Sequence, residues 1–550
     1  MSKITLTTCA ALILAAGLLT TACSHQTSES KITITTPGNP YLPLWEHIPD
    51  GEPYVFEDPD QPGRQRVYIY GSHDTRITDY CGREQVVWSA PTDSLNCWRF
   101  DGEILRVDTN AKGEPFDSAR TADVLFAPDV TLVTDSTGKK TYYLFPNDQT
   151  GGRNGLIAKS ERPDGPFEVC NWSADDPTKT DGIYGFDPAV FVDDDGRIYG
   201  YWGFGHSMAA EIDPATMCTI KPGTKMIDGM IPGYQEQPGN DFRFFEASSI
   251  RKIKDKYVFI YSRFTKEGEF GLPTTNYTLA YAYSNRPLGP WTYGGTIIDG
   301  RAREVNEQGD TIASANVSGN THGSICEVNG QWYVFYHRQS GLNEFARQAM
   351  AAPITVSVEE GPDGKVSISE GEYTSEGFAL DGLDPTEYHS AGIACWYTGP
   401  KVAVHEWPNN TYYGSYIEAG YGTDDKFEAP YALHNNTNSV VNNTDGSIVG
   451  YKYFNFNKTH GRNDVKLVVH LVPMGIDGLI TVMLDRPWTS QGGQAIGTIQ
   501  LRAGMPQQPA ELSVPLPALA SVAGKHAIYF VFTSEMKEKS LCTLHDFVMQ

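Results

Sequence analysis

Positive charge is scarce in this sequence. Its 550 residues include 43 Lys and Arg against 67 Asp and Glu, which gives a formal net charge of −24. A surface of that sign repels phosphate backbones and leaves no broad basic patch for DNA or RNA. We therefore expect no nucleic-acid partner, and the acidic balance is typical of a well-solvated surface.

Cysteine is also scarce, and it is spread without pattern. Nine are present, and the seven that follow residue 23 show no C-x-x-C pair or other metal-ligand spacing. This distribution argues against a cysteine-ligated metal and against a catalytic thiol. Cys81 and Cys97 are the nearest pair in sequence, so they are the first choice if one disulfide forms.

Long apolar runs are missing after the N-terminus, so we expect no transmembrane span there. The first 23 residues differ, because Lys3 precedes an apolar run and Ala22 precedes Cys23, as in a bacterial lipoprotein export signal. We expect a lipid on Cys23 to be the only membrane attachment and to anchor the protein in the bacterial cell envelope, on its periplasmic face or on the cell surface. Secretion without a lipid is the alternative. Residues 24–36, rich in Ser and Thr, predict a flexible tether.

Glycine, proline and aromatic residues are plentiful, which favours many short strands joined by turns. Five runs of aromatic and β-branched residues each follow a turn and read as the second arm of a hairpin: 66–70, 141–145, 197–201, 256–261 and 331–336. A proline-containing corner follows each run at a similar interval. Repeated units of this kind bury their faces only by packing on one another. The sequence therefore predicts an all-β fold with a five-bladed β-propeller at residues 37–355. A β-sandwich with accidental similarity between its strands is the alternative.

The repeat pattern stops near Val356. Residues 356–383 carry turn signals and predict a linker or a covering hairpin. From residue 384 to 550 the alternation of apolar and polar residues returns in four long runs, which is typical of a β-sandwich, here taken as jelly-roll-like. We expect this segment to be a second module, with ligand binding and bracing of the propeller as its alternative roles.

One column of residues recurs in the first strands of the five repeats. Aligned on their turns, these strands place Glu52, Ala127, Asp187, Glu246 and His322 at the same position. The innermost strands of a propeller surround its axis, so equivalent positions meet across the central channel. Three carboxyl groups and an imidazole would then share one pocket, at a free-energy cost that a structural role seldom demands. Paired carboxyl groups facing each other over a gap are the machinery of glycosidic-bond cleavage.

Around these residues the sequence resembles glycoside hydrolase family 43. The resemblance spans about residues 37–355 and is carried by five motifs in the family's order: Glu52-Pro53, Phe126-Ala127-Pro128-Asp129-Val130, Phe186-Asp187-Pro188-Ala189-Val190-Phe191, Phe245-Glu246-Ala247 and Thr321-His322-Gly323-Ser324. It implies a general base at Glu52, an acid at Asp187 that orients and tunes, and a general acid at Glu246. The family typically has Asp at the first position. Asp50, two residues earlier on the same side of a strand, is therefore the alternative base.

Further residues are candidates for binding. The resemblance places His322 beside the channel axis, where a calcium ion or a water can sit, so Ca²⁺ is the one metal expected. Residues just past strand ends are candidates for sugar hydroxyls, and aromatic residues near the column are candidates for stacking on a sugar ring. These candidates are His73, Asp74 and Arg338 for hydroxyls and Phe126, Trp202 and Phe244 for stacking.

The C-terminal module resembles the carbohydrate-binding sandwiches often attached to this family, most visibly at Gly450-Tyr451-Lys452-Tyr453-Phe454. Its candidate platforms for a sugar are Trp396, Trp407 and Trp488. The resemblance implies an inverting, exo-acting glycosidase on oligo- or polysaccharide side chains of plants, with α-L-arabinofuranosidase as the first choice. β-Xylosidase and β-galactofuranosidase are the alternatives within the family. A non-catalytic glycan-binding propeller lipoprotein is the alternative outside enzymes.

Overall fold

The computed structural model describes residues 31–76, 78–115, 124–148, 155–236, 239–419 and 438–550. The chain divides after Lys31, and all the strands named here belong to the unit Ile32–Gln550. The predicted export signal at 1–23 lies outside the described residues, as does most of the predicted tether. In the part of the chain that the structure describes, no helix is long and apolar enough to cross a membrane.

Five antiparallel sheets follow one another along residues 33–354. They are β1 (Thr33–Thr35), β5 (Cys97–Arg106), β4 (Glu84–Pro91), β3 (Gln65–Tyr70) and β2 (Glu52–Glu57); then β6 (Leu125–Thr134), β7 (Lys140–Asp148), β8 (Ala158–Ser160) and β9 (Glu168–Val169); then β10 (Ala189–Val192), β11 (Ile198–Trp202), β12 (Met208–Ile212) and β13 (Ile227–Asp228); then β14 (Phe244–Ile253), β15 (Lys256–Arg263), β16 (Thr278–Ser284) and β17 (Thr292–Asp299); and last β20 (Ser324–Val328), β21 (Gln331–Gln339) and β22 (Arg347–Ile354).

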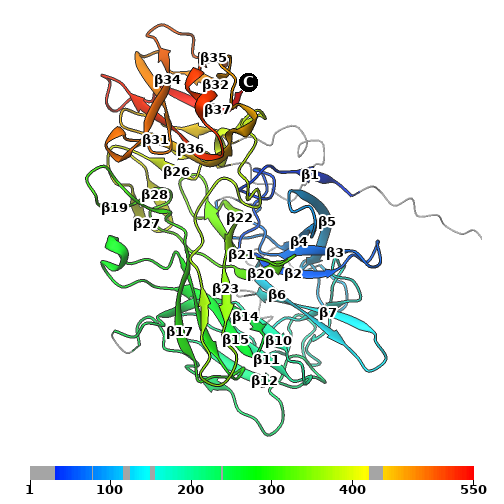
Figure 1. The fold of residues 1–550 in the computed structure, drawn as a ribbon. Helices are drawn as coiled ribbons and strands as arrows, with labels where there is room; N and C mark the ends of the chain where they lie inside the picture. Colours follow the sequence, from blue (N-terminus) through cyan, green and yellow to red (C-terminus); the bar gives the residue numbers. More distant parts are fainter. Residues whose placement is uncertain (1–30, 77, 116–123, 149–154, 237–238, 420–437) are drawn as a thin grey trace, which may run out of the picture. The chain divides into compact units, whose positions relative to one another are not determined.

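The first strands of these sheets form a closed series. Strand β2 contacts β6, β6 contacts β10, β10 contacts β14, β14 contacts β20, and β20 contacts β2 again (Figure 1). Each sheet buries its two faces against its neighbours, because a single twisted sheet of three to five strands cannot shield its apolar side chains from water. The strand runs and hairpin turns expected from the sequence are present in all five sheets.

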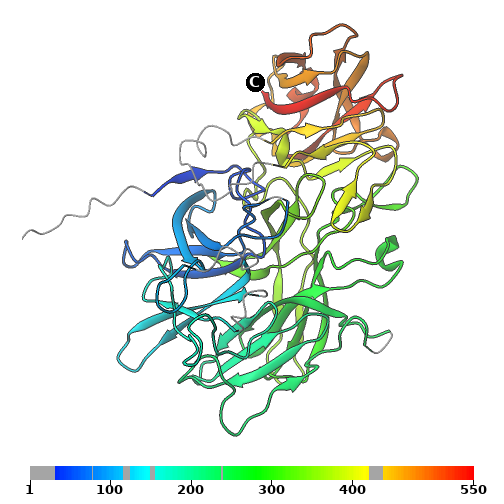
Figure 2. The same ribbon diagram turned by 180° about the vertical axis from the view of Figure 1, so that it is seen from behind.

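Residues 389–549 build a two-layered sandwich, drawn from yellow to red in Figure 2. One sheet has the order β29 (Tyr416–Ile417), β30 (Val440–Val441), β37 (Cys542–Met549), β32 (Lys466–Pro473) and β35 (Ala510–Pro515), with β25 (His389–Ser390) also pairing with β37. The other has the order β26 (Trp396–Thr398), β31 (Ile448–Asn455), β36 (Lys525–Thr533), β33 (Gly478–Leu484) and β34 (Gln494–Leu501). Their facing side chains, such as Phe454, Phe530 and Phe547, form the core. An all-β chain with a propeller and a following sandwich is thus confirmed.

Short hairpins complete the chain: β18 (Arg303–Val305) with β19 (Thr311–Ala313), β23 (Val356–Val358) with β24 (Val366–Ile368), and β27 (Val404–Glu406) with β28 (Asn409–Thr411). Among the described residues, five 3-10 turns lie in loops between strands: η1 (Glu269–Gly271), η2 (Ala391–Ile393), η3 (Phe456–Lys458), η4 (Thr489–Gln491) and η5 (Pro517–Ser521). Strands β23 and β24 occupy the start of the segment expected to be a linker or covering hairpin.

Two sequence expectations differ from the structure here. The end of the predicted tether is not loose chain, because Thr33–Thr35 pairs with β5 and extends the first sheet. Cys81 and Cys97 are both free thiols, so the nearest pair in sequence forms no disulfide.

Arg338 has a structural role. Its side chain is fully buried, and its guanidinium donates to the Gln348 side chain and to the backbone carbonyl oxygens of Gly392 and Ala394, the latter at 2.7 Å. These bonds join β21 to the start of the sandwich. Arg338 therefore does not face a sugar, because the start of the sandwich covers it. The sequence predicts a second module but does not indicate which propeller strand the module covers.

Candidate active site

One cavity of about 660 Å³ collects residues from the beginnings of all five sheets. Its lining includes Asp50, Ala127, Asp187, Glu246 and His322, each inside or within two residues of a first strand. Because the first strands contact one another in a closed series, side chains nearly 300 residues apart in the sequence meet here. Four of these five belong to the predicted column, and Asp50 stands where Glu52 was expected.

The strand register explains this difference. Glu52 and Ala189 are the first paired residues of their hairpins, and each pairs with a tyrosine of the next strand. Glu52 is therefore equivalent to Ala189, and Asp50 is equivalent to Asp187, two residues earlier in each case. Asp50 and Asp187 also share a left-handed backbone, with φ of 60° and 49°. The proline after each acid, at Pro53 and Pro188, had suggested the wrong alignment.

Asp50 is held by donors on several sides. Ser72 Oγ donates to its Oδ2 over 2.6 Å, and Arg347 Nη1 lies 3.1 Å from Oδ1 and 3.3 Å from Oδ2. The Asp50 backbone N–H donates to His337 Nδ1 over 3.3 Å. Burial raises the pKa of Asp50, but Arg347 and the neighbouring imidazoles outweigh it and bring that pKa below its ordinary value. This carboxyl group is therefore ionised.

Glu246 lies in the same cavity, and its pKa is shifted in the opposite direction. Burial, followed by the charges of Asp187 and Asp50, raises the pKa of Glu246 well above its ordinary value. Strand β14 has irregular pairing on both sides of Glu246, between Phe244 and Ser249. Bulges of this kind turn a side chain out of the regular ladder. The bulges aim Glu246 into the cavity. There, burial and the neighbouring carboxylates keep it protonated next to an ionised partner.

Asp187 is fixed in orientation by neutral donors. Asn147 Nδ2 donates to its Oδ1 over 3.0 Å, and the Ala247 backbone N–H donates to its Oδ2 over 3.1 Å. Asp187 thus bonds to the residue that directly follows Glu246. His322 Nδ1 lies 3.6 Å from Asp187 Oδ2 and its Nε2 lies 3.9 Å from Glu52 Oε1. Burial lowers the pKa of His322, but Asp187 and the other carboxylates prevail and raise it.

The donor set around His322 does not fit a calcium ion. Both ring nitrogens of His322 and Glu52 Oε1 are buried without a hydrogen-bond partner in the described structure. Calcium takes six to eight oxygen ligands, whereas among the described residues no group of three or more His, Cys, Asp or Glu side chains could hold an ion. Orphaned polar atoms of this number suit an ordered water instead.

Glu52 itself lies deeper along the first strand, outside the lining of this cavity. Arg251 Nη2 donates to its Oε2 over 2.8 Å, and the Arg251 guanidinium lies 4.6 Å from the centre of the Tyr54 ring. The Tyr54 hydroxyl donates to Asp129 over 2.6 Å. Burial and the Glu52 carboxylate raise the pKa of Asp129 to about 7. Glu52 is thus one member of a buried charge cluster.

Of the remaining residues predicted in the propeller, one lines the cavity and four do not, and of the predicted platforms in the second module Trp407 lines it. Phe126 lines the cavity. His73 is buried against Glu46 and Glu84, with its Nε2 3.0 Å from Glu46. Asp74 accepts from Arg347 Nε over 2.8 Å and so orients the arginine that holds Asp50.

Trp202 and Phe244 are core residues. Trp202 packs edge-on against Tyr184 at 5.7 Å, and Phe244 is fully buried against Phe259. The ring that lines the cavity is Phe245 rather than Phe244. In the sequence, an aromatic residue directly precedes the column residue in three repeats, at Phe126, Phe186 and Phe245, and all three line the cavity. That repeated position was the signal for the correct aromatics.

Other lining residues carried no signal of this kind. Arg347 lies in the last strand of the fifth sheet, whereas Tyr80 and Glu344 lie in loops. His405 and Trp407 come from the hairpin β27–β28, beyond the predicted propeller. Only the folded chain brings these residues to the cavity.

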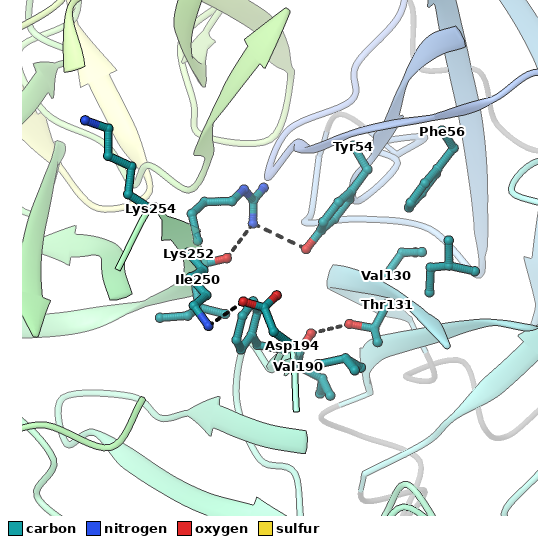
Figure 3. Close-up of a pocket in the computed structure, with 13 residues that line it drawn as sticks. Tyr54, Phe56, Val130, Thr131, Val190, Asp194, Ile250, Lys252 and Lys254 are labelled. Atoms are coloured by element: carbon teal, nitrogen blue, oxygen red, sulfur yellow. Dashed lines mark hydrogen bonds and ion pairs between the residues drawn. The ribbon is translucent and has the colours of Figure 1, made fainter. Parts of the chain in front are cut away.

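A second cavity, of about 460 Å³, is lined by later residues of the same first strands (Figure 3). Its basic residues are all partnered. Arg251 binds Glu52, Lys252 Nζ lies 2.8 Å from Asp194 Oδ2, and Lys254 Nζ donates to a backbone carbonyl over 3.2 Å. Thr131 donates to the Val190 carbonyl beside them. This cavity has no pair of carboxyl groups in different protonation states.

Comparison with known proteins identifies a family to which the chain is similar. The family model for glycosyl hydrolases family 43 matches residues 60–362. A xylosidase/arabinosidase of Thermoclostridium stercorarium is 31% identical, over 92% of this chain and 98% of its own. An arabinoxylan arabinofuranohydrolase of Paenibacillus polymyxa is 26% identical, over 90% of this chain and 72% of its own.

Solved structures of this kind are also similar. An arabinoxylan arabinofuranohydrolase of family 43 from Bacillus subtilis, in complex with cellotetraose, is 20% identical, with 93% of this chain and 97% of that chain covered and a TM-score of 0.45. A β-xylosidase/α-arabinofuranosidase from a compost metagenome, in complex with xylotriose and in a calcium-free form, is 23% identical over 61% of this chain and 98% of that chain, with a TM-score of 0.43.

Proposed function

Because this chain belongs to glycosyl hydrolases family 43 and is a glycoside hydrolase, we propose that it is an inverting, exo-acting enzyme that removes α-L-arabinofuranosyl side chains from plant polysaccharides. In this proposal Asp50 is the general base and Glu246 the general acid. Asp187 orients and tunes the acid. Glu52, the base first expected, becomes part of the buried scaffold.

One observation carries the proposal: two carboxyl groups of one cavity have pKa values displaced in opposite directions. The pKa of Asp50 is below its ordinary value and that of Glu246 is well above it. A glycosidase needs one ionised and one protonated carboxyl group at the same pH. A structural ion pair lowers the pKa of its carboxyl group, so ion pairing alone does not account for the raised pKa of Glu246.

The chemistry follows from these protonation states. Asp50 accepts a proton from a water molecule, whose oxygen attacks the anomeric carbon. Glu246 gives its proton to the departing glycosidic oxygen, so that the leaving group departs as a neutral alcohol. Arg347 and Ser72 keep Asp50 ionised and oriented during the attack. After the reaction Asp50 is protonated and Glu246 ionised, and exchange with solvent restores both.

The inverting outcome is supported by the placement of the two acids. Asp50 precedes β2 and Glu246 lies in β14, and these strands are not neighbours in the closed series. Each reaches the cavity from its own side, which leaves room for a water between base and sugar. Inverting enzymes need that wider separation.

The choice of arabinofuranose is supported by the names of the relatives, which include xylosidase/arabinosidase and arabinofuranohydrolase. A β-xylosidase and a β-D-galactofuranosidase are also among them, so these sugars are the alternatives. We also propose, from the sequence alone, that the protein is exported and lipid-anchored at Cys23 in the cell envelope. Calcium is not part of the proposal, because the donor set does not fit it.

A direct test is hydrolysis of 4-nitrophenyl α-L-arabinofuranoside, β-D-xylopyranoside and β-D-galactofuranoside, with the first-formed anomer followed by NMR. We expect the arabinofuranoside to be cleaved fastest and with inversion. The Glu246→Gln variant should fold and lose about 10²- to 10⁴-fold in kcat, the usual contribution of a general acid. Retention of configuration would contradict the mechanism. A folded wild-type protein that cleaves none of the three, yet binds oligosaccharide, would instead indicate the non-catalytic alternative.

A further inference from the structure

We propose that Trp407 of the C-terminal module forms the subsite for the leaving group: its indole stacks on the sugar ring that carries the arabinofuranose. This inference rests on the proposed function and extends it from the cleaved sugar to its neighbour. It assigns part of the substrate site to the sandwich module, for which the sequence had suggested either sugar binding or bracing of the propeller.

Trp407 lies at the mouth of the catalytic cavity. It lines the cavity together with His405, and it is 70% exposed, whereas Asp50 is 5% and Glu246 is 9% exposed. The acids are therefore deep and the indole is at the opening. In an exo-acting enzyme the terminal sugar enters to the acids, and the rest of the substrate projects outward from the oxygen that Glu246 protonates. Trp407 is in the region where that next ring would lie.

The position of Trp407 is fixed by pairing between the hairpin β27–β28 and a loop of the propeller. Asn410 N–H donates to the Leu342 carbonyl over 2.8 Å, and Glu344 N–H donates to the Pro408 carbonyl over 3.2 Å. Asn343 and Asn409 form an isolated antiparallel bridge. An exposed tryptophan on such a braced hairpin is ready for a ligand, because little backbone entropy is lost when a sugar binds.

Side-chain contacts connect this hairpin to the catalytic base. His405 Nε2 lies 3.2 Å from one oxygen of Glu344, and the Tyr80 hydroxyl donates to the other over 2.5 Å. The Arg347 guanidinium lies 5.0 Å from the centre of the Tyr80 ring. Arg347 in turn binds Asp50. A sugar on Trp407 is thus held in a constant relation to the base.

The chemistry of the cavity walls suits a sugar ring. Phe204, 55% exposed, and Phe245 line the same cavity, so exposed aromatic faces occur both at the mouth and inside. Aromatic faces offer large, rigid contact areas for the apolar C–H faces of a pyranose or furanose. A volume of about 660 Å³ is within the range of pockets that enclose a ligand larger than one sugar.

The test compares two substrates that differ only in the leaving group: an arabinose-substituted xylo-oligosaccharide and methyl α-L-arabinofuranoside, whose methanol cannot reach Trp407. For Trp407→Ala we expect the ratio of kcat/KM, oligosaccharide over methyl glycoside, to fall roughly 10- to 30-fold, as for a central aromatic contact. Trp407→Phe should recover much of that ratio. Tyr388→Ala is the matched control, because Tyr388 is an exposed aromatic of the same module, stacked on His470 outside the cavity lining. Its ratio should not change.

Three outcomes would overturn the inference: an unchanged ratio in Trp407→Ala, an equal loss on both substrates, or the same fall in Tyr388→Ala. Affinity gives a second readout that does not need turnover. In the Glu246→Gln background, the Kd for the oligosaccharide, measured by calorimetry, should rise by a similar factor when Trp407 is also replaced. If the wild-type protein hydrolyses neither substrate, the proposed function fails. An unchanged Kd would then reject the role of Trp407 separately.

Discussion

Two cavities are built on the same first strands of this protein, and only one of them is suited to catalysis. The cavity at the strand beginnings contains the carboxyl groups of Asp50, Asp187 and Glu246. The cavity further along the strands contains Arg251, Lys252 and Lys254, each with an acid or a carbonyl as partner. In the first cavity the carboxyl groups act on one another, so that Glu246 has a raised pKa beside an ionised Asp50, whereas Asp194 is the single carboxyl group among the described residues that line the second.

The boundary between the cavities is the buried pair of Glu52 and Arg251. Two acids of the same strand region, Asp50 and Glu52, therefore have different tasks although they are two residues apart. Asp50 is in the lining of the first cavity, and Glu52 neutralises an arginine of the second. Replacing each acid in turn should separate the two roles.

The largest effect is expected from Asp50→Asn. Loss of the base should lower kcat by up to about 10⁴-fold while the protein stays folded. The matched change in the second cavity is Asp194→Asn, which removes an acid bound to Lys252. It should leave kcat within about twofold, because surface ion pairs contribute little. Steady-state rates of both variants check this comparison, and an equal loss in the two would erase the distinction between the cavities.

Glu52→Gln should act on stability instead of turnover. It leaves the Arg251 guanidinium buried beside a neutral amide, and breaking a buried ion pair in this way costs about 3 kcal/mol of unfolding free energy. Urea denaturation measures the loss, with Glu57→Gln as control, because the Glu57–Lys140 pair is exposed and should matter little. The folded Glu52→Gln protein should keep its turnover. If its kcat fell as far as that of Asp50→Asn, Glu52 would regain the role of base.

The smallest effect is a shift of the pH profile in Asp187→Asn. In the wild type, kcat/KM should rise as pH increases through the pKa of Asp50, below its ordinary value, because the base must be ionised. It should fall again as pH passes the pKa of Glu246, well above its ordinary value, because the acid must be protonated. The Asp187 charge helps to raise the pKa of Glu246, so its removal should move the alkaline limb to lower pH and leave the acid limb in place. An alkaline limb that does not move would mean that Asp187 does not tune Glu246.

Much of the site was predictable because repeats carry their own register. The equivalence of Ala127, Asp187, Glu246 and His322 follows from turns and strands that recur at similar intervals, and all four line one cavity. The alignment failed at the first repeat. Asp50 lies before the regular strand in a left-handed conformation, which neither strand alternation nor the shared proline reveals. The predictions for Trp202 and Phe244 were wrong for another reason: the sequence does not indicate on which face of a sheet an aromatic side chain packs.

Local sequence patterns were enough to predict the strands, the repeat, the order of the two modules and the acids from which a catalytic set could be drawn. These depend on local patterns: alternation, turn residues and spacing. Three features became visible only in the folded chain: Asp50 and not Glu52 lines the cavity, Arg347 binds Asp50, and Trp407 reaches the opening from another module. Those outcomes depend on ring closure and on packing between distant segments, where the burial and charge of each group are set by neighbours that the local sequence does not contain.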